Sequence, residues 1–331
     1  MFDTLINMAA VNNGMAIFKP LYWFFGKCME GLLIVFDYKY FLALIVFTVA
    51  TRLVLFPLNI KQQKAMAKTT RMQPKIQKIQ KKYAGSNDPR DRQKMNEEMQ
   101  ELYSREGHNP MNMGCGPMIF QMVFLMGIIG IIYYPIEYIL GVKIADNSQA
   151  IAEAIGFTTK GGASYFQIDL LQNFANYKAT LMEQFPTLFT EEKVQAIEAY
   201  KSHMYIGSLD MTQTPHWKDG LIVIIPILCL VTSLASTVLS TMIQKKTNPA
   251  AAQQSSQMLI MMLMMPFFSF YIAFKVSAAV GFYWIISNLV AMVQQLVMAK
   301  FFPPKRNVAR EMIENTIQRR AREESIKKAN K

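Results

Sequence analysis

The chain is poor in the residues from which catalytic and metal centres are built. Its 331 residues include only three cysteines and three histidines, and neither a CxxC nor an HExxH pattern occurs. The long apolar runs contain no Asp, Glu or His in their interiors, so they offer no nucleophile–base pair or metal ligand set to an intramembrane enzyme. We therefore expect a protein that is not an enzyme and that holds no cofactor or metal.

Signals for processing are absent as well. The stretch MFDTLINMAAVNNG has neither a basic n-region nor an A-x-A cleavage site. Cys28 follows the sequence FGK, which is a poor context for lipoprotein acylation. We expect the chain to be neither cleaved nor lipidated.

What the chain has instead is apolar length. Hydrophobic residues make up 52% of it, and the mean hydropathy is +0.14. A helix of about 20 residues crosses the hydrocarbon core of a bilayer. Apolar runs of about that length predict transmembrane helices at 39–60, 113–135, 221–242, 258–274 and 278–299. Composition and runs together predict an all-α polytopic membrane protein with five transmembrane helices.

The segments that join these runs differ in character. Residues 15–36 are apolar but interrupted by Lys, Pro, Gly and Glu. This pattern favours an amphipathic helix in the membrane interface, with a poor sixth span as the alternative. The joining segments are an N-terminal segment 1–38 that contains this helix, a basic region 61–112, a long loop 136–220, a short loop 243–257 and a basic tail 300–331.

The basic region 61–112 contains two helical patterns on either side of the turn sequence GSNDP. A thin apolar stripe follows each helix, formed by Met66, Ile76, Ile79 and Tyr83 on the first and by Met95, Met99, Leu102 and Tyr103 on the second. The other faces are charged. These patterns predict an antiparallel helical hairpin.

Charge is distributed unevenly among the joining segments. Region 61–112 has twelve Lys or Arg against six acids, and the tail after Phe302 has nine against four, whereas 142–219 has six lysines against nine acids. With five spans, the basic segments share one side of the membrane and the acidic segment lies on the other. The positive-inside rule then predicts a plasma-membrane protein with its N-terminus outside and its hairpin and C-terminus in the cytoplasm.

One cation interrupts the first apolar run. Arg52 lies about 13 Å along the helix axis from Lys61, the next cation in the chain, at 1.5 Å of rise per residue. A snorkelling side chain recovers only part of that depth. Because no span offers a carboxylate at this depth, Arg52 needs water or neutral polar partners. The alternative is a purely structural arginine that snorkels or bonds backbone carbonyls.

Neutral polar groups are available in the spans. They are Thr48, Thr51, Gln121, Ser233, Ser236, Thr237, Asn288 and Gln295. Ser233, Ser236, Thr237 and Ser240 follow i, i+3, i+4, i+7 spacing and so share one helix face. Pro57 also leaves the carbonyl of Leu53 without its helical donor. We predict that these groups line a water-filled groove around Arg52; for the serine face, simple close helix packing is the alternative.

Three stretches carry a resemblance to a known family. TRLVLFPLNIKQQKAM, HNPMNMGCGPMIFQM and GFYWIISNLV look like the corresponding motifs of the YidC-type membrane protein insertases (the YidC/Oxa/Alb family), in family order. Within this family, the chain resembles the five-span form found in Gram-positive bacteria. It implies a five-helix core with a hydrophilic groove, in which Arg52 is the groove arginine and Gln121 the groove glutamine, and it makes 61–107 the family's cytoplasmic hairpin.

The resemblance also implies partners. Nascent membrane proteins are the expected clients, the ribosome and targeting factors are expected at 61–107 and 300–331, and the Sec translocon is an optional partner. For the basic tail, attraction to anionic lipids is an equal alternative. A small-solute transporter or channel is the rival function, and the odd span number and the lack of an intramembrane acid stand against it.

Overall fold

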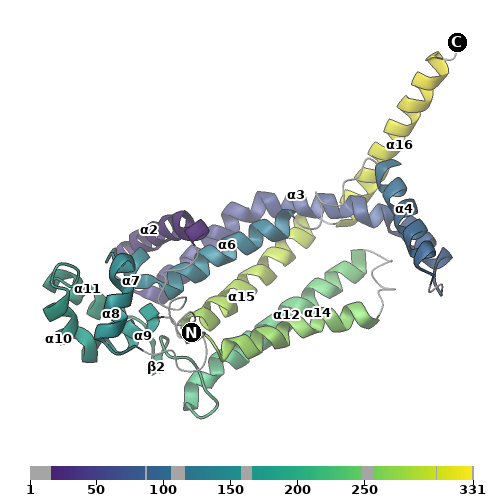
Figure 1. Cartoon of the computed structure of the whole chain (residues 1–331). Helices are drawn as coiled ribbons and strands as arrows, with labels where there is room; N and C mark the ends of the chain where they lie inside the picture. Colours follow the sequence, from purple (N-terminus) through teal and green to yellow (C-terminus); the bar gives the residue numbers. More distant parts are fainter. Residues whose placement is uncertain are drawn as a thin grey trace. The chain divides into compact units, whose positions relative to one another are not determined.

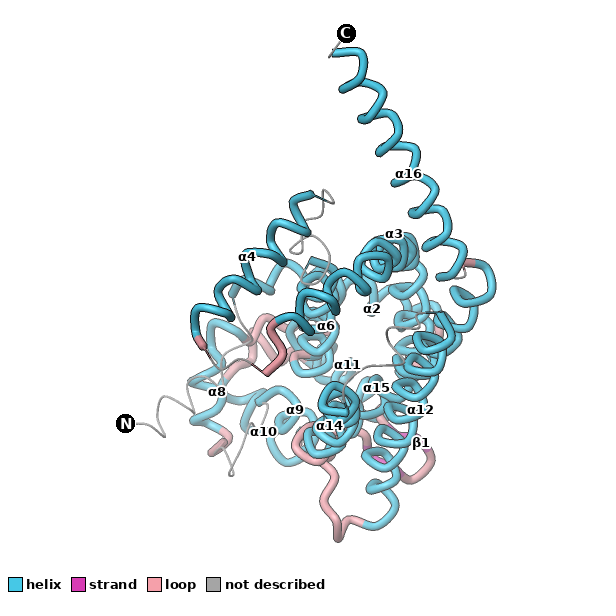
Figure 2. Tube along the Cα trace, turned by 90° about the vertical axis from the view of Figure 1, so that its right-hand side faces the viewer, coloured by secondary structure: helices cyan, strands magenta, loops and turns pink. Residues whose placement is uncertain are grey.

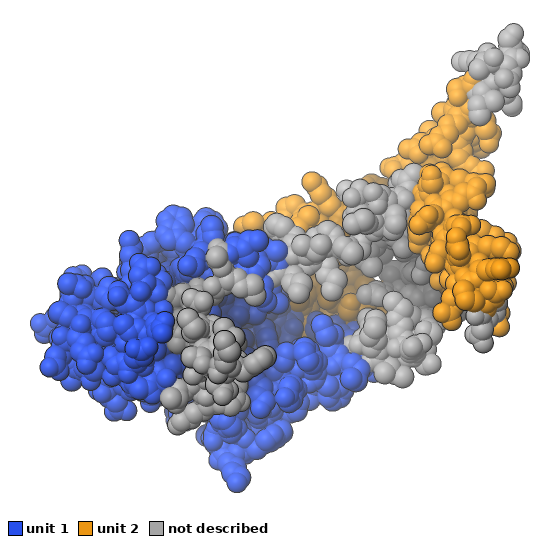
Figure 3. Space-filling view, in the orientation of Figure 1, with its two compact units in different colours: residues 1–52, 122–237, 261–290 blue, residues 53–121, 238–260, 291–331 orange. Residues whose placement is uncertain are grey.

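The computed structural model describes residues 16–85, 88–105, 116–157, 166–247, 256–302 and 304–329. Its residues divide into two compact units, drawn in different colours in Figure 3. Unit 1 comprises residues 1–52, 122–237 and 261–290, and unit 2 comprises residues 53–121, 238–260 and 291–331.

Long apolar helices dominate the chain (Figure 1). They are α3 (Tyr40–Lys82), α6 (Gly116–Tyr133), α12 (Ile224–Thr247, preceded by the 3-10 turn η3, Gly220–Val223), α14 (Ser256–Ala273) and α15 (Ala278–Phe301). Within the residues that the structure describes, three segments are long and apolar enough to cross a membrane: Tyr40–Gln63, Gly220–Ile243 and Ala278–Phe301. Shorter apolar helices cover Val123–Tyr133 and Leu263–Ala273 in the other two predicted spans. The structure confirms an all-α polytopic membrane protein, while the number of spans stays a prediction.

Helix α3 does not end where its apolar run ends. It continues through Pro57 and Pro74 to Lys82 and so includes the first helix predicted for region 61–112. The residues after Ile60 are mostly Lys, Gln, Ala and Met, which favour helix. Each proline removes one backbone donor, but the turns on either side keep their hydrogen bonds.

Helix α2 (Lys19–Val35, preceded by η1, Ala16–Phe18) corresponds to the amphipathic helix predicted at 15–36. Its buried face recurs at helical spacing through Tyr22, Phe25, Met29 and Leu33. This face packs on α6 and on the short helix α7 (Pro135–Tyr138), where Tyr22 contacts Tyr138 edge to face at 5.4 Å between ring centroids. Its location in the membrane interface stays a prediction.

The described parts of the acidic segment (residues 142–219), which are 142–157 and 166–219, fold as a small helical assembly in unit 1. Its elements are η2 (Ala145–Asn147), α8 (Ser148–Ala154), α9 (Phe166–Gln172), α10 (Phe174–Gln184), α11 (Glu191–Ser202) and the strands β1 (Tyr205–Ile206) and β2 (Leu209–Asp210). Figure 2 shows that most of the described chain is helical, with loops and turns between the helices. The strands pair antiparallel, with Tyr205 opposite Asp210. Phe166, Phe174 and Phe189 are each 1% exposed and form a core that the mixed pattern of the sequence did not indicate.

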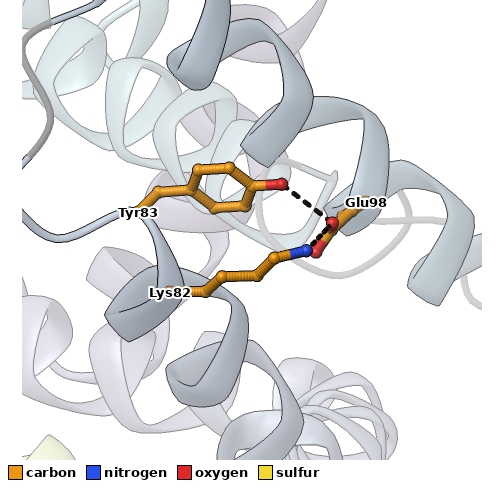
Figure 4. Close-up of polar contacts among 3 residues, drawn as sticks. All are labelled: Lys82, Tyr83 and Glu98. Carbon is orange, nitrogen blue, oxygen red and sulfur yellow. Dashed lines mark hydrogen bonds and ion pairs between the residues drawn. The ribbon is translucent and has the colours of Figure 1, made fainter.

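Unit 2 contains the basic hairpin, residues 61–107. Its second helix is α4 (Pro89–Arg105), which lies after the turn at Gly85. Glu98 of α4 accepts hydrogen bonds from Lys82 and, at 2.8 Å, from the hydroxyl of Tyr83, so these side chains join the two arms (Figure 4). The tail forms the exposed helix α16 (Pro304–Ala329).

Parts of some predictions lie outside the described residues. These parts are residues 1–15, 86–87 of the predicted turn, 106–115 with Cys115, 158–165 of the loop 136–220, 248–255 of the loop 243–257, and 303 and 330–331 of the tail.

Candidate functional site

Arg52 bonds to a hydroxyl on another membrane helix of unit 1. The guanidinium of Arg52 on α3 donates from Nη2 to Oγ of Ser287 on α15 at 2.7 Å. Ser287 is 8% exposed, and Arg52 is half-buried. Among the described residues, no carboxylate forms an ion pair with Arg52. In the described part of the chain, this charged group thus has a neutral hydroxyl as its hydrogen-bond partner.

A tyrosine completes the surroundings of this bond. Tyr283 lies one turn before Ser287 on α15 and is 3% exposed. It interacts electrostatically with Arg52 and shares a side-chain hydrogen bond with Ser287. Residues 283 and 287 share a helix face because side chains four residues apart are neighbours. One face of α15 therefore presents two hydroxyl groups to the arginine.

The residue after Ser287, Asn288, links α15 to the helix α12. Asn288 donates from Nδ2 to Oγ of Ser233 at 2.8 Å and to Oγ1 of Thr232 at 3.3 Å, both on α12. The Thr232 hydroxyl itself donates to the carbonyl of Leu228 at 2.8 Å. Residues 287 and 288 lie about 100° apart around the helix. Ser287 therefore bonds to α3, whereas Asn288 bonds to α12.

The predicted threonines bond mainly to their own helices. Thr48, 1% exposed, donates to Leu44 O at 2.7 Å, and Thr51 donates to Thr48 O at 2.8 Å. Thr237 donates to Ser233 O at 2.9 Å. Threonine hydroxyls in helices commonly bond to a carbonyl three or four residues earlier. Thr48 and Thr51 lie on the Arg52 helix, and Ser236 is a half-buried neighbour of Thr237 on α12.

Two predicted groove residues belong to unit 2. The side chain of Gln121 lies outside the described residues, although its backbone is part of α6. Gln295 lies on α15, where its amide oxygen is buried and finds no hydrogen-bond partner among the described residues. Such an oxygen is typical of a place that water completes.

Three residues of this polar contact were missed from the sequence: Ser287, Tyr283 and Thr232. The signal for Ser287 was its position beside Asn288 in GFYWIISNLV, one turn after Tyr283. The serine face of α12 has a regular spacing that predicts one shared helix face, whereas a single serine has no such pattern. Within the described chain, no three His, Cys, Asp or Glu residues are grouped to hold a metal ion.

The fold and this contact define a class: an all-α membrane protein in which a lone arginine is satisfied by neutral polar groups on a neighbouring span. A family model described as 60Kd inner membrane protein matches residues 32–305. The chain belongs to this family, and the relatives that it matches are named membrane protein insertases.

Individual relatives support the same membership. A protein named membrane protein insertase YidC from Oceanobacillus iheyensis is 46% identical over 88 residues, which is 27% of this chain and 34% of that protein. Membrane protein insertase YidC 1 of Listeria monocytogenes is 42% identical over 92 residues, 28% of this chain and 31% of its own length. The relative from Clostridium tetani is 30% identical over 166 residues, 50% and 71% of the two chains. The chain thus spans about a third of the length of the first two relatives. All three relatives are bacterial membrane proteins.

Proposed function

We propose that this chain is a membrane protein insertase. It accepts hydrophilic segments of nascent membrane proteins in a positively charged groove and releases their apolar segments sideways into the bilayer. The observation that carries this proposal is the Arg52–Ser287 contact, in which a half-buried cation has a hydroxyl partner at 2.7 Å in place of a carboxylate. A cation without a neutralising partner remains able to attract an acidic client segment.

Physical chemistry explains why such a site helps insertion. Moving an unpaired polar group from water into hydrocarbon costs roughly 2–7 kcal/mol, and a charged side chain at the bilayer centre costs about 2.5 kcal/mol or more. The hydroxyl and amide groups of Ser287, Asn288 and Ser233 replace part of the lost water. Arg52 adds an attraction for acidic residues that is stronger in a low dielectric than in bulk water.

Release of the client depends on apolar contact. The helix α14 exposes Met264, Met265, Phe267 and Phe268, each more than half exposed. Methionine side chains adapt to varied apolar partners, so this face suits the successive client helices that leave toward lipid. Ordinary contact with lipid is the simpler role of the same face.

The basic segments are the proposed contacts with the translation machinery. The basic hairpin and the tail 300–331 carry the excess of Lys and Arg, and we place both in the cytoplasm with the N-terminus outside. Helix α16 also exposes Ile313 and Ile317, each 61%. Ribosomal RNA, targeting factors and anionic lipids all match this charge, and the Sec translocon is an optional partner. A ribosome cosedimentation assay over a salt series, with lipid vesicles as competitor, separates RNA from lipid binding.

The test of the groove charge is complementation of an insertase-depleted bacterium with wild type, Arg52→Ala and Arg52→Lys at equal membrane levels. We expect Arg52→Lys to support growth and Arg52→Ala to insert a client with an acidic translocated segment at least tenfold less efficiently. A client with a neutral segment should lose much less. Equal insertion of the acidic client by all three chains would reject the electrostatic step.

A second variant addresses the arginine's partner. Ser287→Ala removes the acceptor at 2.7 Å and leaves a half-buried guanidinium with one polar contact fewer, so we expect a twofold to tenfold loss with the acidic client. Ser269→Ala, a half-buried serine on α14, is the matched control and should insert both clients as wild type does. If the two variants behave alike, Ser287 does not orient Arg52.

A further inference from the structure

The acidic segment supplies the cap of a membrane helix. Helix α15 begins at Ala278, and the first backbone N–H groups of any helix have no partner within the helix. The N–H of Ala278 donates to the carbonyl of Gln213 at 2.8 Å, and that of Ala279 donates to the carbonyl of Met211 at 2.9 Å. Both carbonyls belong to the acidic segment, so backbone groups from a remote stretch complete α15.

The residue that would ordinarily cap this helix is not used for it. Ser277 immediately precedes α15 and is of the type preferred at an N-cap. Its hydroxyl is buried, at 1% exposure of the residue, and has no hydrogen-bond partner among the described residues. A serine cap accepts the N–H of the second or third helical residue. Here the N–H of Ala279 donates to the carbonyl of Met211, and that of Val280 donates to the carbonyl of Ser277 at 3.0 Å. Capping from the acidic segment therefore replaces the local cap.

Asp210 holds the two carbonyls in place. Its Oδ1 accepts the backbone N–H of Thr212 at 2.9 Å and the Thr212 hydroxyl at 2.6 Å, and its Oδ2 accepts the Tyr205 hydroxyl at 3.1 Å. The N–H of Met211 donates to the carbonyl of Met204 at 2.9 Å. Met211 and Thr212 are 0% and 1% exposed. The N–H of Gln213 donates to the carbonyl of Asp210 at 3.2 Å. Hydrogen bonds thus fix the backbone on both sides of the Met211 carbonyl and just before the Gln213 carbonyl.

The same segment also holds the helix of Arg52. Tyr200 of α11 packs edge to face on Tyr40, the first residue of α3, with ring centroids 5.4 Å apart and each residue 1% exposed. Lys201 fixes α11 to α9 through a 2.6 Å hydrogen bond to Gln172 O. Beside this contact Phe41 of α3 meets Phe282 of α15 at 5.0 Å. The acidic segment thus contacts the N-terminal ends of both α3 and α15, the two helices that form the Arg52–Ser287 contact.

We propose that the acidic segment is a brace that sets the axial register of α15 against α3, and that Asp210 is the positioning residue of this brace. Ser287 lies nine residues, about 13.5 Å, beyond Ala278 along α15. A slip of one residue moves it by about 1.5 Å and rotates it by about 100°, which is enough to break a 2.7 Å hydrogen bond. This inference rests on the proposed function, because it gives the brace an effect on client insertion through Arg52.

The experiment measures hydrogen exchange along α15 in the full chain in lipid nanodiscs. Asp210→Ala should speed exchange of the Ala278 and Ala279 amides at least tenfold, whereas Asp210→Asn, which keeps an oxygen acceptor for Thr212, should stay within twofold of wild type. Asp219→Ala is the matched control, since Asp219 bonds only to His216 of its own turn in the described contacts. Thr212→Val, which removes one hydroxyl bond, serves if Asp210→Ala does not fold. Unchanged exchange in Asp210→Ala, or in Thr212→Val where Asp210→Ala does not fold, overturns the brace.

Insertion assays connect the brace to the arginine. If Asp210 acts through Arg52, Asp210→Ala lowers insertion of the acidic client more than that of the neutral client, and adding it to Arg52→Ala lowers insertion no further. An equal loss for both clients overturns the positioning role and leaves only a structural one. If Arg52→Ala itself inserts both clients normally, the groove proposal fails, and the exchange data still decide whether the cap exists.

Discussion

The acidic segment and the basic hairpin both lie outside the apolar runs, yet different interactions stabilise the fold of each. The acidic segment buries phenylalanines to 1% exposure and donates backbone carbonyls to α15. The hairpin is joined near its turn by Glu98 with Lys82 and Tyr83, whose side chains remain partly or largely exposed. The difference indicates that one segment is built to fix positions and the other to present charge.

The largest expected effect is a difference in stability between substitutions in the buried core of the acidic segment and in the apolar stripe of the hairpin. Tyr200→Ala removes a fully buried ring from its contact with Tyr40, and we expect a loss of about 3–5 kcal/mol in the free energy of unfolding. Tyr103→Ala in the half-buried stripe of the hairpin should cost clearly less. Thermal unfolding of the purified chains in detergent measures both, with Tyr200→Phe as the conservative control. Equal losses from the two alanine variants would remove the contrast between the regions.

A smaller effect is expected at glycines. A Cβ at Gly26 of α2 would run into the backbone carbonyl of Tyr138, so Gly26→Ala should destabilise unit 1 by about 1–3 kcal/mol. Gly85 of the hairpin has open space around it but a φ of +99°, so Gly85→Ala should cost about 1 kcal/mol through backbone strain alone. Gly31→Ala, in the same helix as Gly26 with no atom near the new methyl group, is the matched control and should be neutral or stabilising. A loss at Gly31 as large as at Gly26 would contradict the steric explanation.

The smallest effect concerns pH. The hydrogen bond from Lys82, with a second from Tyr83, lowers the pKa of Glu98 below its ordinary value of 4.5. The stabilisation from this carboxylate is therefore present above pH 4.5 and is lost as the pH falls through the lowered pKa. Spin labels on Lys78→Cys and Gln100→Cys, in a chain whose own cysteines are replaced, should report a broader distance distribution at about pH 3 than at about pH 7. Glu98→Gln should show a weaker dependence on pH, and an identical dependence would exclude Glu98 as the titrating group.

The sequence predicted the elements whose cause is local. Apolar length located helices at the five runs. The grouping of the predicted polar residues around Arg52 stays a prediction, although the structure does link two of them, Asn288 and Ser233. The sequence did not predict Ser287 as the partner of Arg52, because the packing of α15 on α3 decides which of two adjacent polar residues faces the arginine. Nor did it predict the cap of α15, because a backbone carbonyl at Met211 or Gln213 leaves no mark in residue type.

Close packing of α2 on α6 restricts how related sequences can vary. A side chain at position 130 would enter the ring of Tyr22, and one at position 127 would meet Leu21 and Phe25. Leu21 can turn aside, but a buried tyrosine ring has little freedom to move. A relative that keeps Tyr22 is therefore expected to keep glycine at position 130 and to accept alanine more readily at 127. In a relative with a larger residue at both positions, we expect a smaller residue in place of Tyr22 or a different path for the chain that precedes Tyr40.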